Sequence, residues 1–209
     1  MSTKTKTKVV AKPEPEALSR YVADASEHPG FRYARYFWRE NGPKCGITTA
    51  VLAKLQPAGH PAARHDLLLP AAAAGEYADL DYLLTRYDAT QPLIERNGYV
   101  QYTIDLLSDR PVHAGWELVR EWVMAYFVRE LQLAALLVLH MPFRAGSANA
   151  SHIHILIPAR RIGPDGFGAH ARSTCSDQGF KDGLNSWMEF QTVQTPAPVQ
   201  VDRHQQRSE

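Results

Sequence analysis

The sequence contains only two cysteines, Cys45 and Cys175, and they lie far apart in a chain of 209 residues. Without a Cys-X-X-Cys spacing they suggest neither a disulfide framework nor a zinc motif, and we expect a reduced, cytoplasmic setting. The chain also lacks a run of ~18 apolar residues, so no membrane span is expected. Its Lys- and Thr-rich N-terminus has no hydrophobic segment, so we expect no secretory signal.

An excess of charge of either sign is also missing. The 23 basic and 22 acidic residues give a formal net charge of +1. This balance does not indicate general nucleic-acid binding, so any DNA-binding surface must be a local patch. A hydrophobic content of 44% and a charged content of 22% are ordinary for a globular protein. The length suits one domain with a sizeable core.

The two ends of the chain differ in composition from its middle. Residues 1–16 combine several lysines with prolines, and we expect a disordered basic arm there. Near the other end, Thr195-Pro-Ala-Pro198 stops any regular element. We therefore expect one folded domain over residues 17–191 and a disordered tail over residues 192–209.

Hydrophobic periodicity and turn signals predict a chain of mixed α and β structure. Helices are expected over residues 17–27, 47–55, 71–74, 79–86, 114–131 and 184–191, and strands over 31–38, 67–69, 99–107, 134–140 and 151–158. The glycine-rich stretch 160–168 is expected to be a loop on the rim. The order of elements predicts an α+β two-layer sandwich, in which helices pack on one face of an antiparallel sheet.

Three histidines mark the pair of strands at residues 134–140 and 151–158. Successive side chains of a strand point to opposite faces, so His152 and His154 share one face, with Cα atoms ~7 Å apart. His140 ends the preceding strand. If the two strands pair, three imidazoles can bind one divalent cation and leave an open position for a substrate. His-X-His alone is a weak signal, because a histidine in a strand usually packs in the core or faces solvent.

The region around these histidines resembles the MobA/MobL family of plasmid mobilisation relaxases. The resemblance runs from His140-Met-Pro-Phe through Asn149-Ala-Ser-His152-Ile-His154 to Arg160 and Gly163-Pro-Asp-Gly-Phe-Gly168. In that family a strand ending in histidine and a loop containing Asn precede His-X-His, an arginine and a similar glycine-rich stretch. Looser matches at Asp66-Leu-Leu-Leu-Pro70, Glu95-Arg96 and Leu184-Asn-Ser-Trp187 extend the coverage to about residues 65–190.

The resemblance implies a relaxase with an HUH-type sheet, which nicks one DNA strand at an origin of transfer and keeps the 5′ phosphate on a tyrosine. It implies a divalent metal ion (Mg²⁺, Mn²⁺ or similar) and, as partners, single-stranded or supercoiled plasmid DNA and accessory mobilisation proteins. The residues carried over are the metal ligands His140, His152 and His154, the nucleophile Tyr36 or else Tyr33, and the DNA-contacting residues Asn149, Arg160 and Arg161.

Three departures from the family pattern keep other functions open. The family's N-terminal segment around the nucleophilic tyrosine is missing, Val100-Gln101 stands where the family carries an Arg-Glu pair, and Met188 replaces an expected basic residue. One alternative is a DNA-binding mobilisation protein of the same fold that does not nick. Another is a metal hydrolase that uses the same histidines with Asp105 or Asp165 as an acidic ligand.

Overall fold

The computed structural model describes residues 22–37, 46–57, 61–92, 95–106 and 109–194. A six-stranded sheet in the order β1-β2-β4-β6-β5-β3 forms its centre, and every neighbouring pair is antiparallel. The strands are β1 (Val22–His28), β2 (Phe31–Phe37), β3 (Arg64–Leu68), β4 (Asn97–Asp105), β5 (Ala135–His140) and β6 (His152–Pro158). The expected arm at residues 1–16 lies outside the described residues.

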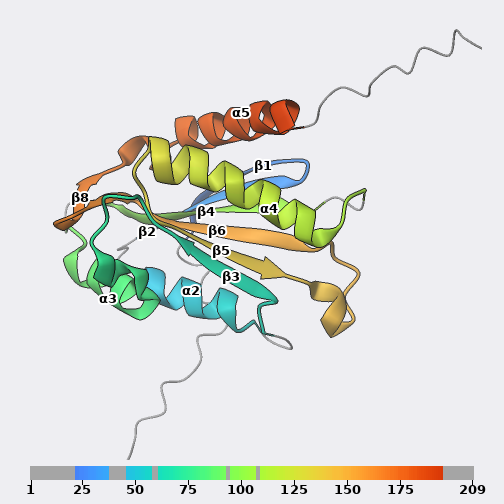
Figure 1. Cartoon of the computed structure of the whole chain (residues 1–209), viewed down its shortest axis with the longest axis horizontal. Helices are drawn as coiled ribbons and strands as arrows, with labels where there is room; N and C mark the ends of the chain where they lie inside the picture. Colours follow the sequence, from blue (N-terminus) through green and yellow to red (C-terminus); the bar gives the residue numbers. More distant parts are fainter. Residues whose placement is uncertain (1–21, 38–45, 58–60, 93–94, 107–108, 195–209) are drawn as a thin grey trace, which may run out of the picture.

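Helices lie on both faces of this sheet (Figure 1). One face carries α4 (Val112–Val123), its π-helical continuation η2 (Met124–Glu130) and α5 (Asp177–Gln194), and the other carries α2 (Ile47–Leu55) and α3 (Leu80–Thr90). The α+β class with an antiparallel sheet is therefore confirmed, and α2 and α3 add a partial layer on the second face. Among the described residues, no helix combines the length and apolar character that a membrane crossing requires.

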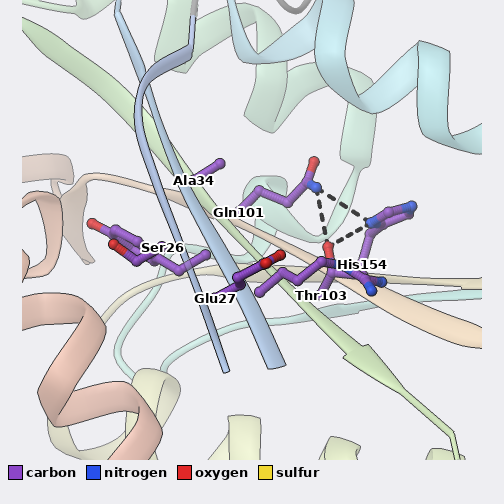
Figure 2. A pocket seen from close by; sticks show the side chains of 8 residues that line it. Ser26, Glu27, Ala34, Gln101, Thr103 and His154 are labelled. Carbon is purple, nitrogen blue, oxygen red and sulfur yellow. Dashed lines mark hydrogen bonds between the residues drawn. The ribbon is translucent and has the colours of Figure 1, made fainter. Parts of the chain in front are cut away.

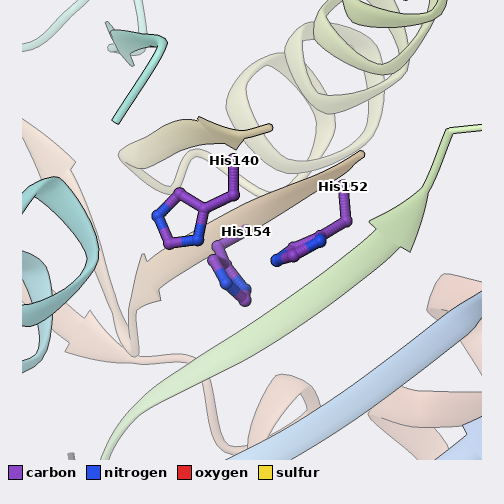
Figure 3. A group of neighbouring side chains, drawn as sticks. All are labelled: His140, His152 and His154. Atoms are coloured by element: carbon purple, nitrogen blue, oxygen red, sulfur yellow. The ribbon is translucent and has the colours of Figure 1, made fainter. Parts of the chain in front are cut away.

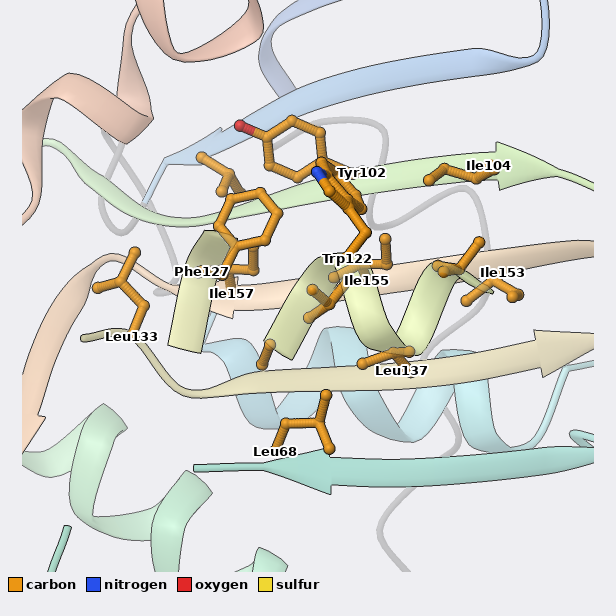
Figure 4. Close-up of a cluster of buried hydrophobic side chains, with 14 of the residues drawn as sticks. Leu68, Tyr102, Ile104, Trp122, Phe127, Leu133, Leu137, Ile153, Ile155 and Ile157 are labelled. Atoms are coloured by element: carbon orange, nitrogen blue, oxygen red, sulfur yellow. The ribbon is translucent and has the colours of Figure 1, made fainter. Parts of the chain in front are cut away.

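Side-chain alternation along the central strands produces two separate cores. Toward α4, alternate residues of β4 and β6 pack around Trp122 and Phe127 (Figure 4): Tyr102, Ile104, Ile153, Ile155 and Ile157. Toward α2 and α3, Leu136, Val138 and Leu156 belong to the second core. A β-strand buried on both faces is apolar at nearly every position, which explains the run Ile153–Pro158.

The helix expected over residues 17–27 is wrong for residues 22–27, which belong to β1. This strand pairs with β2 through Pro29-Gly30, with His28 opposite Phe31. Gly30 has φ +75°, and a proline followed by a glycine with positive φ is the pattern of a type II turn. The Ala- and Glu-containing segment favours a helix locally, but pairing with the aromatic strand β2 overrides that weak preference.

The rim loop expected over residues 160–168 is also wrong, because these residues belong to a β-hairpin. Its strands are β7 (Arg160–Gly163) and β8 (Gly166–His170), with Gly163 opposite Gly166. Gly166 has φ +89°, and a Cβ there would lie 2.3 Å from the hydroxyl oxygen of Tyr77. Glycine thus permits both the turn and the close packing, and a two-stranded ribbon tolerates the residues that a central strand would not.

Most of the remaining elements follow the expectations with shifted ends. The helix expected over residues 71–74 is wrong, because these residues form a turn, closed by a bond from the Ala73 N–H to the Pro70 carbonyl, before the 3₁₀ helix η1 (Gly75–Ala78). The helix expected over residues 184–191 starts earlier and extends beyond the expected domain end, to Gln194. Two further 3₁₀ helices are short. η3 (Pro142–Ala145) lies in the connection between β5 and β6, and η4 (Arg172–Cys175) precedes α5.

A side chain from α3 caps the N-terminus of α2. Asp88 accepts hydrogen bonds from the backbone N–H of Ile47 (2.9 Å) and Thr48 (3.2 Å) and from the Thr48 hydroxyl (2.6 Å). A Cβ on Gly46 would lie 2.2 Å from Asp88 Oδ2, so glycine leaves room for the carboxylate. A negative charge at a helix N-terminus is favourable. The cap therefore fixes α2 against α3.

Tyr87 connects α3 to the sheet, and its hydroxyl gives a test of the fold. The buried hydroxyl donates a hydrogen bond to the carbonyl of Gly98 and accepts one from the backbone N–H of Ala159. We expect Tyr87→Phe to lower the free energy of unfolding by about 1–3 kcal/mol, because two buried backbone groups lose the hydroxyl and keep only their mutual bond of 3.3 Å. Urea denaturation followed by circular dichroism measures the change.

Tyr82→Phe is the matched control, because the same helix exposes 38% of Tyr82 to solvent. Its effect should stay within about 0.5 kcal/mol, as is usual for surface positions. Equal effects of the two substitutions would contradict the bridging role of Tyr87.

Candidate metal centre

The antiparallel register of β5 and β6 brings three histidines together. His140 lies opposite His152, and His154 lies one pleat further along the same face of β6. The ring centroids are 5.3 Å apart for His140 and His152, 4.7 Å for His140 and His154, and 4.8 Å for His152 and His154 (Figure 3). One nitrogen from each ring lies within 4.8 Å of the other two.

Hydrogen bonds to carbonyl oxygens fix the tautomers of two of these rings. His140 Nε2 donates to the carbonyl of Lys54 at 2.6 Å, and His152 Nδ1 donates to the carbonyl of Ala150 at 2.9 Å. A carbonyl oxygen only accepts, so each of these nitrogens carries the proton. In the neutral rings the lone pair is then on Nδ1 of His140 and Nε2 of His152, so each ring keeps one nitrogen able to bind a cation.

Burial keeps the imidazoles of β6 neutral. Desolvation lowers the pKa of His154 well below its usual value, and the nearby positive charge of Lys54 lowers it further. Desolvation also lowers the pKa of the half-buried His152, although its bond to Ala150 opposes this. A neutral imidazole is the form that binds a metal ion, so the electrostatics of the site suit a cation.

The three histidines could hold a metal ion. Bonds of ~2.1 Å place two ligand nitrogens at most ~4.2 Å apart, so the rings would need to close by less than ~1 Å. Among the described residues no other histidine, cysteine or carboxylate completes this cluster. Three neutral ligands leave coordination positions for a substrate and water, as in catalytic rather than structural sites.

A cleft of about 460 Å³ lies beside the cluster, over β1, β2 and β4. His154, Gln101 and Thr103 line it and are joined by hydrogen bonds (Figure 2). Arg32 also lines it, and the charges of Arg32 and Lys54 both act on His152 and His154. No sequence signal indicated that Arg32, Thr103 and Lys54 belong to the site, and Gln101 stood out only as a departure from the family pattern. For Arg32, Gln101 and Thr103 only the alternation along β2 and β4 signals a shared face, because the pairing of β4 with β6 is long-range. Lys54 comes from α2 and has no such signal.

The two carboxylates considered as acidic ligands lie in different places. Asp105 lies opposite His152 in the register of β4 and β6, but Arg32 holds both of its oxygens, at 2.7 and 2.9 Å. Asp165 is exposed in the turn between β7 and β8, beyond the opposite end of β6. Neither of these two carboxylates is therefore placed to complete the cluster, which weakens the hydrolase alternative.

The two tyrosines proposed as nucleophiles are both buried. The hydroxyl of Tyr33 donates a hydrogen bond to the carbonyl of Thr174 at 2.7 Å, on the side of the sheet that carries α5. Tyr36 stacks on Tyr99 with a centroid distance of 4.6 Å and belongs to the core that shares the histidines' face. Tyr36 lies opposite Tyr99, and His154 lies opposite Thr103, four residues further along β4. Four residues correspond to ~13 Å along the strand, which is the separation between Tyr36 and the histidines in that direction.

The structure separates the three residues expected to contact DNA. Asn149 is exposed in the loop that leads into β6, near His152. Arg160 and Arg161 follow the far end of β6, since that strand runs away from the histidines. Arg161 is exposed, whereas Arg160 is 9% exposed and donates to the carbonyls of Gly168, Thr90 and Phe167. These bonds give Arg160 a structural role in the β7–β8 hairpin.

No protein family model matches the sequence, and no curated protein matches it. The fold is similar to a solved structure reported under the words "Molecular Basis of Vancomycin Resistance Transfer in Staphylococcus aureus". The TM-score is 0.50 at 17% sequence identity, and the match covers 63% of this chain and 69% of that chain. At this identity the likeness supports the α+β fold and leaves activity to the arrangement of the site.

Metal binding gives a direct test of the cluster. Titration with Mn²⁺ in a calorimeter should show one site per chain. His154→Ala should weaken it by about 100-fold or more, since even the outer partners of such ligands contribute 10–100-fold. His113→Ala, an exposed histidine on α4, is the matched control and should bind like the original protein. Equal binding by both variants would mean that the ion sits elsewhere.

The lowered pKa values of His152 and His154 predict the pH dependence of this binding. Protons compete with the cation only once the rings protonate, which happens below the ordinary histidine pKa of ~6.5. Proton competition at His152 and His154 should therefore leave the Mn²⁺ affinity level as the pH falls from 8 to about 6.5 and reduce it only below that. Calorimetry across this range measures it, and a decline that starts near pH 7.5 would contradict the role of burial.

Proposed function

We propose that the chain is a relaxase-like, metal-dependent DNA strand transferase that nicks single-stranded DNA at a plasmid transfer origin. The observation that carries the proposal is the convergence of three imidazoles beside an open cleft of about 460 Å³. The fold similarity to a protein from a study of resistance transfer supports it. The proposed partners are single-stranded or supercoiled plasmid DNA and accessory mobilisation proteins, in the cytoplasm.

The charges around the histidines suit a phosphodiester. A divalent cation held there would neutralise charge on the non-bridging oxygens of the scissile phosphate. Lys54 adds positive charge close to His152 and His154, whereas the charge of Arg32 is paired with Asp105. Burial lowers the pKa of Lys54, so the low polarity around its ammonium strengthens an interaction with an anion. Asn149, exposed beside the site, is proposed to contact the DNA strand.

A tyrosine is proposed as the nucleophile of this reaction. Its hydroxyl oxygen forms a bond to the phosphorus, and the bond between phosphorus and the 3′ oxygen breaks. The departing 3′ oxygen takes up the proton that the tyrosine hydroxyl loses. The phosphotyrosyl ester conserves the energy of the phosphodiester bond, so attack by a 3′ hydroxyl reverses the reaction. Tyr36 is preferred to Tyr33, because Tyr36 lies in the core on the histidines' face and the Tyr33 hydroxyl bonds on the other.

A second candidate function is DNA binding without strand cleavage. The specific observation behind it is the burial of both candidate tyrosines, with exposed fractions of 7% for Tyr36 and 3% for Tyr33. In that case the histidine cluster and the nearby cations would hold a DNA strand, and nicking would depend on another protein.

A nicking assay separates the two functions. Supercoiled plasmids carrying candidate transfer origins are incubated with the protein and Mn²⁺ and analysed on denaturing gels. A covalent protein–DNA band is expected with the original sequence and should disappear in His154→Ala and Tyr36→Phe. Tyr33→Phe is the matched control and should retain the band, because its hydroxyl faces α5.

DNA binding without any covalent band, across origins that other relaxases cleave, would favour the non-nicking protein. Release of nicked DNA with no attached protein would favour the metal hydrolase. A band that survives Tyr36→Phe would reject Tyr36 and leave the metal site standing.

A further inference from the structure

Gln101 and Thr103 lie on β4 beside the third histidine and bond the nitrogen that faces away from the cluster. Thr103 is opposite His154 in the register of β4 and β6, and its Oγ1 lies 2.9 Å from His154 Nδ1. Gln101 Nε2 lies 3.1 Å from Thr103 Oγ1 and 3.3 Å from His154 Nδ1. All three side chains are buried, with exposed fractions of 8%, 3% and 8% for Gln101, Thr103 and His154.

The amide of Gln101 is the part of this group whose hydrogen bonds do not match a metal-binding His154. Gln101 Oε1 is fully buried and has no hydrogen-bond partner. At the same time Gln101 Nε2, which only donates, points at His154 Nδ1. A donor at that position requires the lone pair of the ring on Nδ1 and the proton on Nε2. His154 would then have no lone pair to offer a cation next to His140 and His152.

Exchanging the two ends of the amide, which are rarely distinguishable by shape, removes the mismatch at His154 Nδ1. The amide nitrogen then takes the buried position at which Oε1 has no partner. Gln101 Oε1 then accepts the hydroxyl proton of Thr103, and Thr103 Oγ1 accepts the proton of His154 Nδ1. Each hydrogen lies between one donor and one acceptor, along the distances of 3.1 and 2.9 Å. The lone pair of His154 is then on Nε2, as it is on one nitrogen of each of the other two rings.

We propose that Gln101 and Thr103 act as a neutral positioning relay, Nδ1–H to Oγ1 and Oγ1–H to Oε1, which fixes His154 in the tautomer that binds a cation. This inference rests on the proposed metal site. Carbonyl oxygens fix the tautomers of His140 and His152, whereas a side-chain amide determines that of His154. Because the relay carries no charge, the site holds its cation more weakly than a carboxylate-backed histidine would.

The tautomer can be read without any metal. In ¹⁵N-labelled protein, long-range ¹H–¹⁵N spectra distinguish a protonated ring nitrogen from one with a lone pair. At pH 7.5 we expect His154 Nδ1 to be the protonated nitrogen, assigned by the loss of its signals in His154→Ala. Thr103→Ser, which keeps the hydroxyl, should retain this tautomer, whereas the isosteric Thr103→Val should shift the population toward Nε2–H.

The affinity for Mn²⁺ gives the second readout. Outer partners of a metal-binding histidine typically contribute 10–100-fold, so Thr103→Val should weaken binding by about that factor and Thr103→Ser should restore most of it. Gln101→Glu should bind Mn²⁺ at least about tenfold more tightly, because a carboxylate accepts the same proton and adds a negative charge. Thr85→Glu, at an exposed position of α3, controls for added charge alone and should have little effect.

A proton on Nε2 of His154 in the original protein would overturn the relay, as would unchanged Mn²⁺ binding in both Thr103→Val and Gln101→Glu. The expected tautomer in a protein that binds no Mn²⁺ would support the relay and contradict the proposed function. Failure of the relay and failure of the proposed function therefore give different results.

Discussion

The antiparallel register between β5 and β6 is the constraint on which the site depends. It places His140 opposite His152, and the pleat of β6 then brings His154 to the same face. A shift by one residue would turn both histidines of β6 into the core beneath α4 and move its isoleucines to the histidines' face. Because Ile153, Ile155 and Ile157 are fully buried, the hydrophobic core specifies this register strongly. The same burial that stabilises the sheet therefore aligns the three imidazoles.

The sequence predicted the parts of the fold that local pattern determines. The long amphipathic helix, the aromatic strand β2 and the apolar strands β5 and β6 all follow from their periodicity. The failures share one physical cause. β1 forms from a segment with local helical preference because it pairs with β2, and the glycines of β7 and β8 are acceptable because Tyr77 and Arg160 support that hairpin. Such tertiary contacts leave no periodic signal in their own segment.

The residues of the candidate site likewise divide into those with a local sequence signal and those that only tertiary contacts bring there. His-X-His after a strand that ends in histidine is a local signal, and the structure brings the three rings together as expected. Thr103 and Gln101 reach His154 from 51 and 53 residues away in sequence, and Lys54 reaches His140 from 86. Nothing local distinguishes them from other polar residues. Arg160 shows a contact that the local pattern did not indicate. It was expected to contact DNA because it precedes a glycine-rich stretch, and the fold engages its guanidinium with backbone carbonyls.

The capping of α2 by Asp88 has a consequence for the histidines. The cap holds the first turn of α2 against α3, and the last turn of α2 presents the Lys54 carbonyl that orients His140. Ligation at the histidines and docking of the helix pair are therefore thermodynamically linked, and each must strengthen the other by the same free energy. A cation bound on the sheet should slow amide hydrogen exchange throughout α2, and loosening of the helix pair should release the ion.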